Sequence, residues 1–144
     1  MKLSFESHLE HQLKAIKSIT DIFEGQPLED SLVEFNLNEE GTLNLINGVR
    51  NNLVLSEEQL LANLNRVQMD NELLASKKLD GMHFSIEMET GTGKTYVYLR
   101  TIYELNKLYG FKKFVIVVPS VPIREGVLKN LEITHEHLQT LYDN

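Results

Sequence analysis

The stretch that decides the expected fold reads Met88-Glu89-Thr90-Gly91-Thr92-Gly93-Lys94-Thr95. Its two glycines, Gly91 and Gly93, allow backbone conformations and a close ligand approach that a Cβ atom would block. Successive backbone N–H groups can then form a cradle for an anion, at the positive N-terminal end of a helix that begins near Lys94. The stretch therefore predicts a phosphate-binding loop, or P-loop.

Two side chains of this loop have defined expected tasks. Lys94 would reach the β- and γ-phosphates of ATP, and the Thr95 hydroxyl would ligate Mg²⁺. The pattern G-x-x-x-x-G-K-[ST] is met except at its first position, where Met88 replaces glycine. With Lys94 as the catalytic residue, the expected nucleotide-binding residues of the loop are Thr90, Gly91, Thr92, Gly93, Lys94 and Thr95.

The segments on either side of the loop predict an α/β fold. Residues 83–88 alternate between apolar and polar side chains, which indicates a strand. Residues 114–118 are apolar without interruption, as in strands of a parallel sheet that are covered on both faces. A helix over 94–109, with Gly110 at its C-cap, would join them into a βαβ unit. Two strands do not make a finished sheet, so we expect this unit to be incomplete.

Other elements are predicted from periodicity and from capping residues. Apolar residues at three- and four-residue steps predict an amphipathic helix over 7–24, and Ser56 with Gln59 predicts a capping box. The remaining expected elements are a helix through about Met69, loop with short elements over 26–54, a polar connector over 70–81, a helix from Pro122 to about Leu131, and a short helix over 135–142 capped by Thr134.

Composition narrows the possible classes of protein. The 144 residues contain no cysteine, which excludes disulfide scaffolds and thiolate metal sites. No apolar run approaches a membrane span and no signal peptide is evident, so we expect a cytoplasmic protein with no membrane partner. The net charge is −7, and residues 1–80 carry all of it, with 7 basic and 14 acidic residues. Any contact with DNA is therefore expected on a local surface of the neutral C-terminal part.

Two longer strings carry a family resemblance. Superfamily 2 helicases and translocases have a P-loop in which the first glycine is replaced, as it is here by Met88. Residues 84–102 and 113–126 resemble the motif I and motif Ia regions of the restriction (Res) subunit of type III restriction-modification enzymes. The resemblance extends over nearly the whole chain. It implies an N-terminal helix with an adenine-reading glutamine (1–25), an acidic insert (26–81) and the first part of an incomplete, truncated RecA-like P-loop helicase lobe (82–144).

The resemblance also implies binding residues outside the loop. Gln12 matches the glutamine that reads adenine, since an amide can pair its donor and acceptor with the base edge. Ser120 and Arg124 lie where motif Ia contacts the DNA backbone in related helicases. The alternatives stay open: an exposed helical glutamine, a helix cap at Ser120 and a surface ion pair at Arg124. The implied partners are double-stranded DNA and the modification (methyltransferase) subunit.

The expected function is the ATP-binding part of an ATP-dependent DNA translocase/helicase motor of a type III restriction endonuclease. We expect the 144-residue chain to be a fragment that has no ATPase, helicase or nuclease activity alone. The alternatives are another P-loop NTPase, such as a small nucleotide kinase, and a truncated interaction module without catalysis. His8 and His11 are interpreted as a solvated pair, and His135 and His137 point to different faces of a helix, which makes them poor joint metal ligands. Glu87 and Glu89 are not assigned acid/base chemistry, because nothing places a substrate between them.

Overall fold

The computed structural model describes residues 6–28, 36–37, 43–44 and 51–142. Its helices are α1 (Glu10–Thr20), the 3₁₀ helix η1 (Asp21–Phe23), α2 (Glu57–Asp70), α3 (Lys94–Tyr109) and α4 (Val121–Tyr142). Two short strands, β1 (Asn36–Leu37) and β2 (Leu43–Asn44), pair antiparallel with Asn36 opposite Asn44. The described part of the chain is thus mainly helical.

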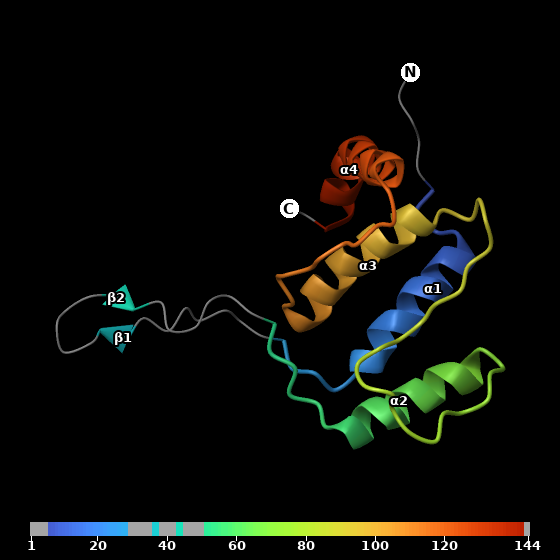
Figure 1. Cartoon of the computed structure of the whole chain (residues 1–144), viewed down its shortest axis with the longest axis vertical. Helices are drawn as coiled ribbons and strands as arrows, with labels where there is room; N and C mark the ends of the chain where they lie inside the picture. The colour runs from blue at the N-terminus through green and yellow to red at the C-terminus, as the bar shows by residue number, and fades with distance from the viewer. Residues whose placement is uncertain (1–5, 29–35, 38–42, 45–50, 143–144) are drawn as a thin grey trace.

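The helices form a layered arrangement around α1 and α3. Figure 1 shows α1 beside α3, with α2 near the end of α1 and α4 on the other side of α3. The connector that leads from α2 back to α3 runs along α1 as an extended strap (Figure 1). This path brings the loop before α3 next to the N-terminal half of α1.

Three small apolar clusters hold these helices together. One joins Ala15 and Ile16 of α1 to Val97 of α3, with Met88 packed against them. The other two clusters are built around Ile22, Leu55 and Leu60, and around Leu105, Tyr109 and Phe111, and both contact Phe23 and Leu53. The first cluster lies directly beneath the phosphate loop, since Met88 begins the loop and Val97 lies in the first turn of α3.

Helix ends that depend on local chemistry are confirmed. The Ser56 hydroxyl accepts from the Gln59 N–H at 3.2 Å and the Gln59 side chain accepts from the Ser56 N–H at 3.0 Å, which completes the capping box. Gly110 ends α3 in the left-handed conformation, and its N–H donates to the Asn106 carbonyl at 2.8 Å. Each of these ends needs only residues within one turn.

The expected fold class, an α/β incomplete RecA-like P-loop lobe, is wrong. Neither residues 83–88 nor residues 114–118 form a strand, and β1–β2 is the only sheet among the described residues. A strand needs a neighbour for its N–H and C=O groups, and a doubly covered strand needs packing on both faces. Val115 and Val117 are instead 88% and 87% exposed. The described residues provide neither a neighbouring strand for these segments nor packing on both of their faces. The apolar pattern alone was therefore not enough to predict a strand.

The C-terminal helices also differ from the prediction. A single helix, α4, replaces the two expected over 122–131 and 135–142. Thr134, the expected cap, is instead fully buried inside α4, and its hydroxyl donates to the Asn130 carbonyl at 2.7 Å. That bond to the preceding turn satisfies the hydroxyl without ending the helix.

The helix predicted near the N-terminus is confirmed in part, whereas the acidic insert stays a prediction. The helix expected over 7–24 is shorter, because α1 ends at Thr20 and continues as η1. Much of 26–54 lies outside the described residues, so the boundaries of the proposed acidic insert stay a prediction. None of the helices in the described ranges combines the length and the apolar composition that a membrane crossing requires.

Candidate functional site

The loop before α3 has the backbone that a phosphate cradle needs. Gly91 and Gly93 have φ values of 83° and 88°, in the left-handed region that favours glycine. Gly93 is the N-cap of the 16-residue helix α3, so the positive end of the helix dipole and its free N–H groups lie at the loop. A Cβ on Gly91 would meet nothing within 4 Å, which leaves this side of the loop open.

The lysine of the loop is held by the loop's own backbone. Lys94 Nζ donates to the Met88 carbonyl at 2.8 Å and to the Glu89 carbonyl at 2.7 Å. The Thr92 hydroxyl donates to the same Glu89 carbonyl at 2.7 Å. The ammonium thus lies within the loop, where it can meet an anion after exchanging one or both carbonyl contacts for phosphate oxygens.

Two side chains of α1 converge on one carbonyl of the loop. Gln12 Nε2 donates to Thr92 O at 2.9 Å, and His11 Nε2 lies 3.3 Å from the same oxygen. Gln12 is only 7% exposed, so the alternative interpretation, an exposed helical glutamine, is wrong. The structure therefore brings Gln12 to the phosphate loop across 80 residues of sequence.

The first turn of α3 carries the expected metal ligand, Thr95, which is partly buried. The described residues contain no group of three His, Asp or Glu side chains that could hold a metal ion. A Mg²⁺ ion at Thr95 would therefore take most of its oxygen ligands from phosphate and water, as this ion commonly does with nucleotides. The residue types fit such a role, since the hydroxyl is a hard oxygen donor beside the loop.

The expected motif Ia residues lie at the start of α4. Ser120 directly precedes the helix, and its carbonyl accepts from the Arg124 N–H at 3.0 Å. Both side chains are exposed. Among the described residues, no hydrogen bond joins either side chain to the glycine loop.

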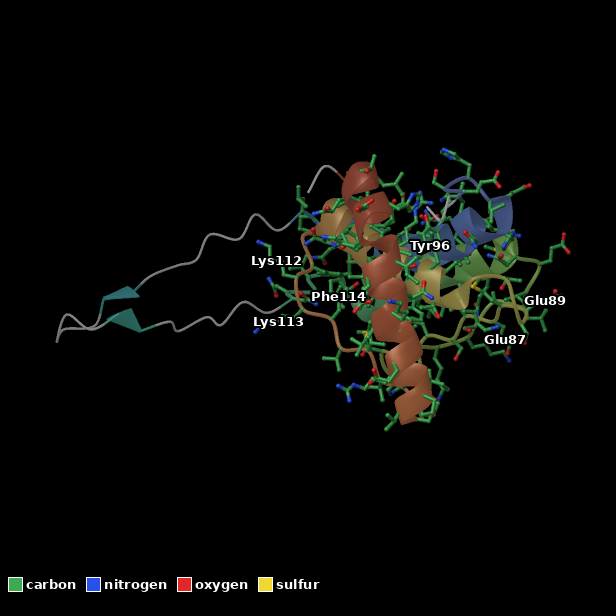
Figure 2. The ribbon with its side chains drawn as sticks, turned by 90° about the horizontal axis from the view of Figure 1, so that it is seen from above. Glu87, Glu89, Tyr96, Lys112, Lys113 and Phe114 are labelled. Atoms are coloured by element: carbon green, nitrogen blue, oxygen red, sulfur yellow. The ribbon has the colours of Figure 1, made fainter. Side chains whose placement is uncertain are left out.

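An open cleft of about 1280 Å³ extends from the phosphate loop between α1, α2 and the strap. Its wall includes Glu89 and Thr92 at the loop end and His11 and Lys14 of α1. Figure 2 shows Glu87 and Glu89 at one edge of the molecule, opposite Lys112 and Lys113. The cleft gives room beside the loop for a ligand much larger than a phosphate group.

A polar network between α3 and α4 was missed from the sequence. Tyr96 OH lies 2.9 Å from His137 Nε2, Arg100 Nε donates to Tyr142 OH at 3.3 Å, and Tyr142 OH donates to Glu104 Oε1 at 2.6 Å. The signal that could have found it is the four-residue spacing of Tyr96, Arg100 and Glu104, which places them on one face of α3.

Burial shifts the protonation equilibria in this network. The pKa of His137 is lowered by burial and by the nearby Arg100 guanidinium. The pKa of Tyr142 is raised by burial and by its hydrogen bond to Glu104. Both shifts favour the neutral forms of His137 and Tyr142 at the contact between the helices. The hydrogen bonds of this network dock α4 on α3.

Comparison with known proteins identifies the family. A model of the family described as "Type III restriction enzyme, res subunit" matches residues 7–141. The chain belongs to this family. The sequence is similar to the Type III restriction-modification enzyme EcoPI Res subunit of Escherichia phage P1, with 32% identity over 145 residues and 97% of this chain. The resemblance stated from the two motif strings is thus confirmed.

Two further Res subunits are similar over shorter regions. The EcoP15I Res subunit of Escherichia coli is 41% identical over 95 residues, which cover 62% of this chain. The StyLTI Res subunit of Salmonella typhimurium is 42% identical over 76 residues, or 51% of this chain. The matched regions cover 14%, 10% and 8% of the three curated relatives. The chain therefore corresponds to a small part of each Res subunit.

Proposed function

We propose that this chain provides the ATP-binding part of an ATP-dependent DNA translocase/helicase motor of a type III restriction endonuclease. The observation that carries the proposal is the glycine loop at the N-terminus of α3, with Lys94 held inside it, in a chain of the Res family. Backbone N–H groups, a helix dipole and an ammonium group at one point favour a polyphosphate over other ligands.

The proposed nucleotide contacts divide between loop and helix. The N–H groups of residues 90–95 would surround the phosphates, and Lys94 would neutralise charge on the β- and γ-phosphates. Thr95 would hold Mg²⁺, which when bound supplies charge neutralisation at the phosphates. Gln12 would pair with adenine beside the loop, where its amide already contacts the Thr92 carbonyl.

The proposed macromolecular partners are double-stranded DNA and a modification subunit. Ser120 and Arg124 are exposed at the N-terminus of α4, where a hydroxyl, a guanidinium and N–H groups can contact one DNA phosphate. The proposed site of action is the cytoplasm. The names of the relatives support the proposed partners, since each describes a subunit of a restriction-modification enzyme.

Catalytic turnover is not proposed for the 144 residues alone. Phosphoryl transfer to water needs groups that hold the metal and orient the water, in addition to the lysine. The described residues contain no acidic cluster of the size that holds a metal ion by itself. We therefore expect binding of ATP·Mg²⁺ without steady-state release of phosphate, and without helicase or nuclease activity.

The test is calorimetric titration of the chain with ATP·Mg²⁺. Because a charge-assisted contact contributes about 1.5–3 kcal/mol, Lys94→Ala should weaken binding by roughly 10- to 100-fold. Lys129→Ala is the matched control, because Lys129 is an exposed lysine of α4 paired with Glu132 at 3.0 Å. Equal affinities of the two variants would refute the proposal, and capture of a modification subunit without nucleotide binding would favour the interaction module.

The DNA contact has its own test. Arg124→Ala should weaken binding of a DNA duplex uniformly across sequences and lower the slope of log affinity against log salt by about one. The matched control is Arg66→Ala on α2, whose guanidinium pairs with Glu24. An unchanged affinity and salt slope for Arg124→Ala would reject the contact.

A further inference from the structure

The carbonyl oxygen of Thr92 is the meeting point of α1 and the phosphate loop. It accepts from the Gln12 amide at 2.9 Å, and it lies 3.3 Å from the His11 imidazole. A carbonyl can only accept, so the His11 Nε2 in this contact carries the proton. Two adjacent side chains of one helix thus converge on one peptide group that lies 80 and 81 residues away in sequence.

The orientation of that peptide group matters for anion binding. The peptide bonds of the described residues are all trans, and in a trans peptide the C=O and N–H groups point in opposite directions. Because the Thr92 carbonyl is held toward α1, the N–H of Gly93 points away from α1. It therefore joins the N–H groups at the start of α3 that can meet an anion.

Steric fit keeps this contact close. A Cβ on Gly93 would lie 2.5 Å from Gln12 Nε2, so the end of the Gln12 side chain would have to move away from its present place beside Thr92. The two helices that flank this contact are packed together, because Ala15 and Ile16 of α1 contact Val97 of α3 in the cluster beneath the loop. Gln12 thus lies between a packed helix pair and the loop, with little freedom of its own.

We propose that His11 and Gln12 are positioning residues that hold the Thr92–Gly93 peptide in its phosphate-binding orientation. The inference rests on the proposed function, because it assigns these residues to the same loop. It adds a role for His11, a residue interpreted from sequence as a solvated histidine. It also gives Gln12 a task that does not depend on the nucleobase, beside any pairing with adenine.

The two tasks of Gln12 predict different losses. A residue that only reads adenine would, when replaced, weaken ATP binding and leave inorganic tripolyphosphate unaffected. A residue that positions the loop would weaken both ligands by the same factor. Gln12→Met removes the amide but keeps the length of the side chain, so it tests the hydrogen bond with little change in packing.

The experiment titrates the chain with tripolyphosphate and with ATP, each with Mg²⁺. Losing one hydrogen bond of ordinary strength should weaken both ligands by about three- to tenfold in Gln12→Met and somewhat less in His11→Ala. His11→Gln, which restores a donor, should recover most of the affinity. The matched controls are Gln139→Ala and His135→Ala, which replace exposed residues of α4 and should change neither affinity.

A second measurement uses the chain without ligand. ¹⁵N relaxation should report rigid amides at Thr92 and Gly93, with an order parameter of about 0.85, and a clear decrease in Gln12→Met and His11→Ala. Since His11 is exposed, His11→Ala should keep its thermal unfolding midpoint, which separates a loosened loop from an unfolded chain.

The outcomes distinguish the inference from the proposed function. Loss of ATP binding with unchanged tripolyphosphate binding in Gln12→Met would overturn positioning by Gln12 and favour base reading. Rigid Thr92 and Gly93 amides in both variants would overturn the positioning role altogether. A wild-type chain that binds neither ligand would refute the proposed function, and the relaxation data would still decide whether α1 holds the loop.

Discussion

The phosphate loop and the apolar run at 114–118 are both sequence motifs, but only one of them has the surroundings its pattern implies. The loop has two left-handed glycines, a capped helix behind it, and contacts from α1 on one side. The apolar run has Phe114 and Val118 partly buried, while Val115 and Val117 are almost fully exposed. The two motifs differ in how many of the contacts that each structure needs come from residues close in the sequence.

A glycine loop followed by a helix is a local structure. The bonds that hold Lys94 and the Thr92 hydroxyl run between residues 88 and 94, and α1 packs beneath the loop. A buried strand is a non-local structure, since every hydrogen bond it makes goes to another strand. A local motif can therefore form from its own residues. A strand needs partner strands, and the described residues do not supply them for 114–118.

The largest loss of polyphosphate affinity is expected from substitution of the loop glycines. Gly93→Ala must accept a φ of 88° and a contact of 2.5 Å with Gln12, so polyphosphate affinity should decrease by more than about tenfold. Gly91→Ala has a similar φ of 83° but open space around the added Cβ, so its loss should be clearly smaller. Calorimetric titration of both variants with tripolyphosphate measures the two losses. Equal losses would show that backbone strain alone, and not contact with α1, shapes the loop.

The same residue type can be compared in the two regions. Val97 beneath the loop is 2% exposed and Val117 is 87% exposed. Val97→Ala should lower the free energy of unfolding by about 2 kcal/mol, from lost burial and a residual cavity. Val117→Ala should stay within about 0.5 kcal/mol of the wild type. Urea denaturation followed by circular dichroism measures both values.

Amide hydrogen exchange checks the same comparison independently. The N–H groups of residues 115–118 should exchange rapidly, and those of 97–101 in α3 slowly. Slow exchange at 115–118, or a large loss of stability in Val117→Ala, would mean that the apolar run has a partner in solution and would contradict the contrast between the two regions.

The capping box at Ser56 offers a smaller test of local encoding. Ser56→Ala removes the acceptor for the Gln59 N–H and should lower the free energy of unfolding by about 1 kcal/mol. The matched control is Ser85→Ala, which replaces an exposed serine of the strap and should have little effect. Thermal unfolding of the two variants gives the comparison, and equal midpoints would contradict the importance of the cap.

The smallest effect concerns acidification at the α3–α4 contact. Because burial lowers the pKa of His137 in the folded chain, the unfolded chain binds the proton first as the pH falls. Stability should therefore decrease as the pH falls below the ordinary histidine pKa of about 6.5, until the folded pKa is also passed. His137→Gln should lower this pH dependence, while His135→Ala should preserve it. Melting temperatures from pH 8 to pH 5 would show the difference.

The sequence predicted the local geometry of the glycine loop better than the fold. Lys94, the glycines and the helix behind them follow from spacing and conformational freedom, and their local geometry is confirmed. Three predictions were wrong: strands at 83–88 and 114–118, and a helix break at Thr134. Each of these features depends on neighbours in space that a linear pattern does not contain. His11 and the α3–α4 network were missed for the same reason, since their partners lie 81 and 41 residues away.

By itself, the sequence of this Res family member determined the conformation of the glycine loop, the capped helix ends and the family. These depend on residues within a turn of each other, or on long strings that resemble known ones. Only the tertiary structure decided that α1 packs beneath the loop, that Gln12 is buried against Thr92, and that α4 is one helix docked through Tyr96, Arg100 and Tyr142. The physical reason is that packing and desolvation act between segments distant in sequence, where neither spacing nor composition indicates which surfaces will meet.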